Sequence, residues 1–118
     1  MSSLNDQSEN NPDFEGVLDV PPQAVKENAD QLMIIDVRRP DEYEGELGHI
    51  KSAQLIVLDT LPERFNDIPK DETVVLICRS GRRSAQASQF LKENGYENTF
   101  NMKGGMLAWN ELGFETEK

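Results

Sequence analysis

The sequence predicts an α/β domain with a central, mainly parallel sheet and helices on both faces. Two observations predict this fold class. Apolar runs of strand length alternate along the chain with segments of helical pattern. The clearest runs, residues 32–37, 55–58 and 73–77, are nearly continuous in Leu, Ile, Val and Met. Continuous apolar runs are typical of strands buried on both faces, as in a parallel sheet.

The first 16 residues differ in composition from the rest of the chain. They are rich in Ser, Asn, Asp and Glu and contain no Lys or Arg. Such a segment has little apolar surface to bury, and it has neither the basic residues nor the apolar centre of a secretory or transit peptide. We therefore expect a flexible acidic N-terminal tail over residues 1–16 and one domain over residues 17–118.

The expected elements follow in chain order, with strands at 17–20 (an edge strand), 32–37, 55–58, 73–77 and 99–102. The expected helices are Pro22–Asn28, one or two turns near 41–44, a short helix with Thr60 as its N-cap, 82–93, and 106–112. Gly95 follows the fourth of these helices at the position where a left-handed residue ends a helix. Glu42, Glu44 and Glu46 are read as a solvated acidic face.

Three features fall where strands of this sheet end. Asp36, Cys78 and the pair Gly104–Gly105 each follow or close a predicted strand. In open parallel sheets, sites form outside the carboxyl ends of the strands. Asp36 interrupts an apolar run, so its carboxylate must be paired, and we expect it to anchor a neighbouring loop. Asp36 and Arg38 are therefore supporting residues rather than catalytic ones.

Composition excludes several kinds of site. The formal net charge is -10, whereas a nucleic-acid backbone needs a basic surface. One cysteine excludes an internal disulfide and a cysteine-rich zinc site, and one histidine excludes a histidine cluster. A carboxylate-only Mg²⁺ or Ca²⁺ site stays open, although no ligand-loop spacing is present. No apolar run approaches the roughly 20 residues that span a bilayer. We expect a cytoplasmic protein with a reduced thiol, no metal, no cofactor and no nucleic-acid or membrane partner.

The strongest functional signal is the cysteine loop, residues 78–83. A buried strand leads into Cys78, and Arg79, Ser80, Gly81, Arg82 and Arg83 follow before a helix. Nearby cations and a helix N-terminus both favour a thiolate over a thiol. A glycine lets successive N–H groups turn inward and bind an anion. The loop therefore predicts a reactive cysteine in an anion cradle.

The spacing within the loop favours a small anion. Four residues separate Cys78 from Arg83. Cysteine phosphatases use five residues before their arginine, and this chain has Ser84 at that position. A cradle one residue shorter fits a single sulfur atom bound to Cys78 better than it fits a phosphate.

Residues 17–114 resemble the rhodanese-like family of single-domain sulfurtransferases. The motifs that carry the resemblance are Ile35-Asp36-Val37-Arg38, Glu42-Tyr43, Gly48-His49-Ile50-Lys51-Ser52-Ala53, Cys78-Arg79-Ser80-Gly81-Arg82-Arg83-Ser84, Asn101-Met102-Lys103-Gly104-Gly105 and Trp109.

The resemblance implies a sulfur relay through a Cys78 persulfide. Cys78 would take a sulfane sulfur from thiosulfate or a persulfide and pass it to cyanide or a thiol, with an arginine of the loop orienting the donor. The sequence does not identify that arginine. Two-domain members of the family have a basic residue near the position of Glu42, and an acid there argues against thiosulfate as the natural donor. The implied partners are a small-molecule or protein persulfide donor and a thiol acceptor, and the oligomeric state stays open.

Two alternatives remain beside the sulfurtransferase. The domain could be a non-catalytic interaction or redox-sensing module, which the intact cysteine disfavours. A small phosphatase or arsenate reductase on the same scaffold is disfavoured by the length of the loop.

Overall fold

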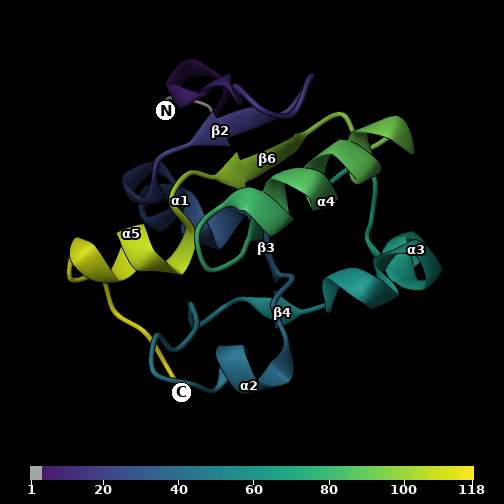
Figure 1. Cartoon of the computed structure of the whole chain (residues 1–118). Helices are drawn as coiled ribbons and strands as arrows, with labels where there is room; N and C mark the ends of the chain where they lie inside the picture. Colours follow the sequence, from purple (N-terminus) through teal and green to yellow (C-terminus); the bar gives the residue numbers. More distant parts are fainter. Residues whose placement is uncertain (1–3) are drawn as a thin grey trace.

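The computed structural model describes residues 4–118 and contains one six-stranded sheet in the order β1-β2-β6-β5-β3-β4 (Figure 1). The strands are β1 (Glu9–Asn10), β2 (Leu18–Val20), β3 (Met33–Asp36), β4 (Gln54–Leu55), β5 (Val74–Ile77) and β6 (Thr99–Met102). β1 pairs antiparallel with β2, and every other pairing is parallel. The predicted mainly parallel sheet is therefore confirmed.

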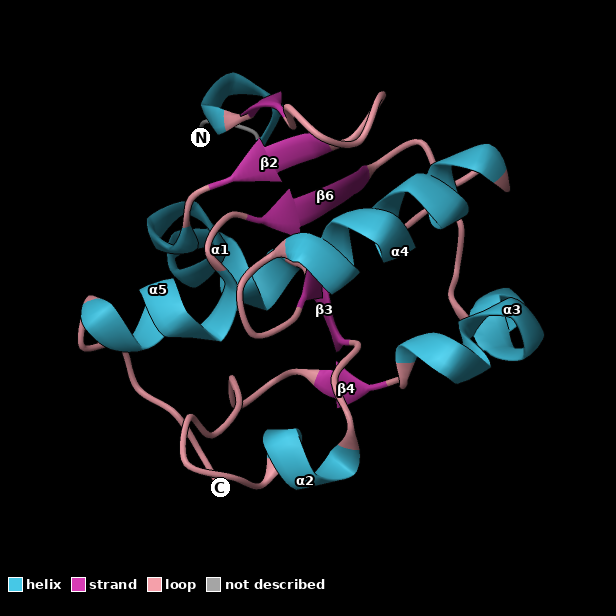
Figure 2. Cartoon of the chain, viewed as in Figure 1, coloured by secondary structure: helices cyan, strands magenta, loops and turns pink. Residues whose placement is uncertain are grey.

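Helices cover both faces of this sheet (Figure 2). They are α1 (Pro22–Asn28), α2 (Pro40–Tyr43), α3 (Leu61–Arg64), α4 (Arg82–Glu93) and α5 (Gly105–Glu111). The 3-10 turns are Leu4–Gln7, Ala29–Gln31, Leu58–Thr60 and Phe65–Asp67. α1 and α5 contribute to one apolar cluster, and α3 and α4 contribute to the other. No helix among the described residues is long and apolar enough to cross a membrane.

β5 lies at the centre of the core because all four of its side chains are buried. Val75 and Ile77 belong to the cluster with α1 and α5, and Val74 and Leu76 belong to the cluster with α3 and α4. This alternation follows from the pleat of a strand, which directs successive side chains to opposite faces. The continuous apolar run of β5 therefore reflects burial on both sides, and Cys78 follows at its carboxyl end.

The strand predicted at residues 55–58 is shorter than the sequence indicated. Residues 55–58 are apolar, but β4 contains only Gln54 and Leu55, and a 3-10 turn begins at Leu58. The N–H of Leu58 still donates to the carbonyl of Val37, just beyond β3, and the 3-10 turn that begins at Leu58 then ends the contact with β3. Thr60 is the N-cap residue of α3, as predicted, but its hydroxyl makes no capping hydrogen bond, because Oγ1 donates to the carbonyl oxygen of Val57, 2.8 Å away.

The predicted edge strand at residues 17–20 is not at the edge. β1 pairs with β2 on its outer side, with Glu9 opposite Asp19. Leu4 is buried in the cluster with α1 and α5. These contacts come from residues predicted as a flexible tail, of which residues 1–3 lie outside the described residues. The division of the chain at residue 17 stays a prediction.

Candidate active site

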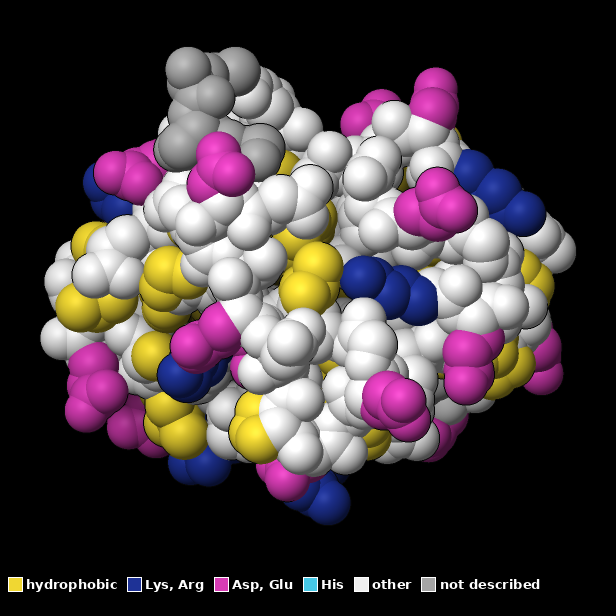
Figure 3. Space-filling model, turned by 90° about the horizontal axis from the view of Figure 1, so that it is seen from above, with side chains coloured by type: hydrophobic (Ala, Val, Ile, Leu, Met, Phe, Trp, Pro, Cys, Tyr) yellow, Lys and Arg dark blue, Asp and Glu magenta, His cyan; other side chains and the backbone are white. Residues whose placement is uncertain are grey.

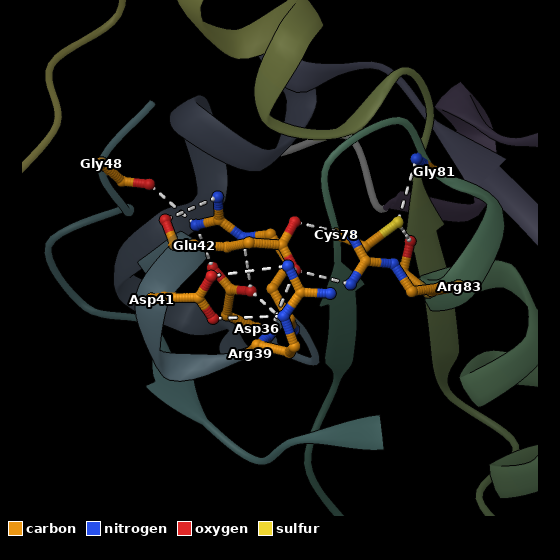
Figure 4. A network of polar contacts seen from close by, with 10 residues as sticks. Asp36, Arg39, Asp41, Glu42, Gly48, Cys78, Gly81 and Arg83 are labelled. Carbon is orange, nitrogen blue, oxygen red and sulfur yellow. Dashed lines mark hydrogen bonds and ion pairs between the residues drawn. The ribbon is translucent and has the colours of Figure 1, made fainter. Parts of the chain in front are cut away.

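Cys78 lies between the carboxyl end of β5 and the N-terminus of α4, and its residue is 1% exposed. Its Sγ accepts a hydrogen bond from the N–H of Gly81 at 3.1 Å. The hydroxyl of Ser84 lies 3.3 Å from the same sulfur, and Figure 4 shows the contact between Gly81 and the Cys78 sulfur. The Gly81 N–H donates to the sulfur, and the single hydroxyl hydrogen of Ser84 can be directed either to the sulfur or to Asn101, so the loop places donors beside the thiol.

The backbone of the loop is held by glycines at two positions. Gly81 has φ +100°, a backbone conformation that residues other than glycine rarely adopt, and it immediately precedes α4. Gly105 packs against the carbonyl groups of Cys78 and Arg79, and a Cβ there would overlap both. The N–H of Met106 then donates to the carbonyl of Cys78 at 2.9 Å. The start of α5 thereby fixes the first residues of the cysteine loop.

The N-terminus of α4 supplies further donors beside the thiol. The first N–H groups of a helix have no partner within the helix, and the N–H of Ala85 is the first to find one, the carbonyl of Gly81. α4 has 12 residues, enough for its dipole to place partial positive charge at this end. The thiol therefore faces the electropositive end of a full-length helix.

The three arginines of the loop have different surroundings. Arg83 forms two hydrogen bonds of 2.8 Å to the carboxylate of Glu42. The Arg82 guanidinium lies over the ring of Phe14, 5.8 Å from its centroid. Arg79 is exposed and lines a hollow of about 300 Å³ together with Glu42. Within residues 4–118, the structure gives the Arg79 side chain no ion pair.

Glu42 is the residue whose surroundings differ most from the sequence interpretation. Its side chain is only 15% exposed, so its assignment to a solvated face was wrong. The hydrogen bonds from Arg83 lower the pKa of Glu42 to about 2, and burial opposes that shift. The same hydrogen bonds raise the pKa of Arg83. The backbone N–H of Arg39 also donates to the Glu42 carboxylate, which closes a capping box at the start of α2.

Asp36 and Arg38 form a buried ion pair beneath α2. Arg38 donates to both carboxylate oxygens of Asp36, at 2.9 and 2.7 Å. It also donates to the carbonyl groups of Gly48 at 2.7 Å and Glu42 at 3.2 Å. Asp36 therefore holds the segment from α2 to Gly48 through Arg38. This contact fixes where Glu42 lies relative to the cysteine loop.

A buried polar chain behind the thiol was missed by the sequence analysis. The hydroxyl of Ser84 donates to Oδ1 of Asn101 at 2.5 Å. Nδ2 of Asn101 donates to Asp19 at 2.9 Å and to the carbonyl of Gly81 at 3.1 Å. Nδ2 of Asn11 donates to both carboxylate oxygens of Asp19, at 3.0 and 3.2 Å. The available signal was the polar residue within each of the two apolar strands, Asp19 in β2 and Asn101 in β6.

Comparisons with known proteins place this site in a family. The sequence profile of the rhodanese-like domain matches residues 21–112. The chain belongs to the rhodanese-like domain family. A sulfurtransferase of Allochromatium vinosum is 37% identical over 86 residues, which are 73% of this chain and 78% of that protein. The putative sulfurtransferase YtwF of Bacillus subtilis is 39% identical over 89 residues, 73% of this chain and 84% of that protein.

Solved structures agree with this assignment. A rhodanese-related protein from Thermoplasma volcanium superposes with a TM-score of 0.77 at 30% identity, covering 82% of this chain and 94% of that one. The rhodanese-like fold is therefore shown, and relatives named sulfurtransferases support sulfurtransferase activity in general terms. Among the described residues, no group of three His, Cys, Asp or Glu side chains could hold a metal ion.

Proposed function

We propose that this rhodanese-like domain is a sulfurtransferase that carries sulfur as a persulfide on Cys78. The observation that supports this most directly is the position of Sγ, which receives the Gly81 N–H at the N-terminus of α4. Donors in this arrangement stabilise a sulfur anion, whether it is the thiolate of the free enzyme or the terminal sulfur of a persulfide.

In the first half-reaction the Cys78 thiolate attacks the outer, sulfane sulfur of the donor. A bond forms between Cys78 Sγ and that sulfur while the sulfur–sulfur bond of the donor breaks. The electron pair leaves with the rest of the donor, as sulfite from thiosulfate or as a thiolate from a persulfide. The enzyme then carries a Cys78 persulfide anion, with no external oxidant or reductant consumed.

In the second half-reaction a thiolate or cyanide attacks the outer sulfur of that persulfide. The new bond leaves the acceptor as a persulfide or thiocyanate, and the electron pair of the broken bond returns to Cys78 as a thiolate. Two transfers through one covalent intermediate predict ping-pong kinetics. The N–H groups at the start of α4 would bind the persulfide between the two steps.

The three arginines of the cysteine loop differ in whether their side chains are already bound within the protein. Arg83 is bound by Glu42, and Arg82 lies against Phe14. Arg79, at the rim of the site and without an ion pair in residues 4–118, is the arginine that we assign to orienting an anionic donor. Arg79→Gln should therefore raise the KM for an anionic donor, with little effect on persulfide discharge to a thiol that has no other charged group.

Intact-mass measurement tests the proposal. The protein is incubated with thiosulfate, and separately with a low-molecular-weight alkyl persulfide, and weighed. One added sulfur, about 32 Da, should appear, should be absent in Cys78→Ser, and should be removed by cyanide or dithiothreitol. Absence of the adduct with both donors would refute the proposal and would leave the interaction module as the better interpretation. Turnover of an aryl phosphate would instead favour the phosphatase.

The partners that fit this chemistry are a small-molecule or protein persulfide as donor and a thiol as acceptor. A free cysteine that must stay reduced between cycles is best placed in a reducing compartment, so a cytoplasmic location remains part of the proposal. No cofactor is required by the two half-reactions.

A further inference from the structure

The charge of Arg83 acts on Cys78 but is already paired with Glu42. Arg83 lies in the first turn of α4, and its pKa is raised mainly by its hydrogen bonds to Glu42 and to a smaller extent by the negative charge of Cys78. Its guanidinium is nevertheless bound end-on by Glu42, with both contacts at 2.8 Å. Figure 4 shows the Glu42 carboxylate pointing toward Arg83 from the other wall of the site. The Arg83–Glu42 pair at the entrance of the site therefore carries no net charge.

Glu42 is fixed in this role by contacts on both sides. The N–H of Arg39 holds its Oε1, and Arg38 donates to its carbonyl group. Arg39 itself is engaged by Asp41, with Nε 3.1 Å from Oδ1. A bidentate arginine–carboxylate pair in a partly buried position is stronger than an exposed one. A donor anion therefore meets an Arg83 whose charge is already compensated and whose two end-on contacts are already made by Glu42.

The net charge of the whole molecule adds to this effect. The formal net charge is -10, and acidic side chains are spread, with basic ones among them, over the face at the β1–β2 side of the molecule, away from α2 (Figure 3). A field of this sign lowers the local concentration of small anions, and more so for a dianion than for a monoanion.

We propose that Glu42 selects the sulfur donor by charge, withholding Arg83 so that singly charged persulfides are preferred to the dianion thiosulfate. The inference rests on the proposed persulfide mechanism. A Coulomb energy is proportional to the charge of the donor. The factor by which the rate rises when Glu42 loses its charge should therefore be, for a dianion, the square of the factor for a monoanion. This relation distinguishes selection by charge from a general change in the reactivity of Cys78.

Glu42→Gln is the variant that tests this role with the least structural change. Glutamine can serve at the same position of a capping box, so α2 keeps its start. The rate constant for persulfide formation is measured with thiosulfate and with a monoanionic alkyl persulfide. We expect increases of about tenfold and about threefold, respectively, for the loss of one charge near the mouth. Both increases should shrink in 0.5 M salt.

Asp41→Asn provides a matched control. It removes the same charge from the same helix, but Asp41 is exposed and contacts Arg39 rather than Arg83. Its effect on either donor should stay within about twofold. Equal gains in Asp41→Asn and Glu42→Gln would overturn the proposal, since they would reflect net charge alone. The double change Glu42→Gln with Arg83→Gln should lose most of the gain with thiosulfate.

A binding measurement removes the dependence on turnover. In the Cys78→Ser background, the additional Glu42→Gln change should tighten the binding of thiosulfate about tenfold, followed by NMR titration. Glu42→Ala repeats both comparisons if Glu42→Gln folds poorly. An unchanged donor ratio in proteins that do form the Cys78 persulfide would refute selection by Glu42 alone. Failure of the wild-type protein to form any persulfide would refute the proposed function instead.

Discussion

Asn101→Ala should destabilise the protein strongly, although it removes only one small amide. Asn101 is 1% exposed, and its side chain makes three hydrogen bonds, with Ser84, Asp19 and the carbonyl of Gly81. Each neutral hydrogen bond contributes about 1 kcal/mol, and one to a carboxylate contributes about 1.5–3 kcal/mol. The sum is about 4 kcal/mol if the lost contacts are not replaced.

The partners of Asn101 keep some of their other contacts, which limits the loss. Asp19 still accepts from Asn11, the Gly81 carbonyl still accepts from Ala85, and Ser84 can still donate to Cys78. We therefore expect a decrease of about 3 kcal/mol in the free energy of unfolding. Without Asn101, the Ser84 hydroxyl can also donate to the Cys78 sulfur without competition from the Asn101 amide oxygen.

Urea denaturation followed by circular dichroism measures this loss. For a domain of this size, about 3 kcal/mol corresponds to a decrease of roughly 2 M in the urea midpoint. Asn110→Ala is the matched control, because Nδ2 of Asn110, like Nδ2 of Asn101, donates twice, here to the carbonyl groups of Leu47 and Met106, but Asn110 is an exposed residue. Its cost should stay near 0.5–1 kcal/mol. Equal losses in the two variants would refute the assignment of a stabilising role to the buried chain.

Three further predictions concern Glu42, two glycines and two leucines. The pKa of Glu42 is lowered to about 2, so its ion pair should stabilise the fold above pH 4.5 and lose that contribution as the pH falls through about 2. Acid titration of stability should show a loss of about 1–2 kcal/mol that is absent in Glu42→Gln. Gly105→Ala should unfold or distort the cysteine loop, since its Cβ would meet two carbonyl groups. Gly113→Ala, whose Cβ would meet nothing within 4 Å, should lower the free energy of unfolding by only about 1 kcal/mol. Thermal melts of the two variants measure the difference. Leu91→Ala should cost about 2–5 kcal/mol in urea and Leu112→Ala less than about 1, because Leu91 is fully buried and Leu112 is 45% exposed. Similar midpoints for the two leucine variants would contradict this placement of the core.

Much of the fold could be predicted because its signals are local. The helix Pro22–Asn28 begins at a proline, and α4 ends just before Gly95, whose φ is +94°. The apolar run of β5 indicated a strand buried on both faces, and Cys78 follows it directly in the chain. Residues 55–58 were misjudged because an apolar run does not say whether its side chains extend a ladder or fill a core.

The contacts that complete the candidate site are not local, and for that reason the sequence did not reveal them. Glu42 and Arg83 are 41 residues apart, and Asp19 and Asn101 are 82 residues apart. Asp19 and Asn101 lie opposite each other on the paired strands β2 and β6. Glu42 and Arg83 meet because their helices, α2 and α4, follow the paired parallel strands β3 and β5. The Glu42-Tyr43 motif distinguished Glu42 from Glu44 and Glu46, but nothing in it pointed to Arg83 as the partner of Glu42.

The two outer strands of the sheet have a consequence for how the protein behaves at high concentration. β1 and β4 each contain only two residues, and they close opposite edges of the sheet. Short outer strands offer few unpaired N–H and carbonyl groups to a strand from another molecule. A chain shortened to begin at Val17 would lose β1 and expose the outer side of β2. Such a shortened protein should associate through that edge, while the full chain should resist edge-to-edge aggregation.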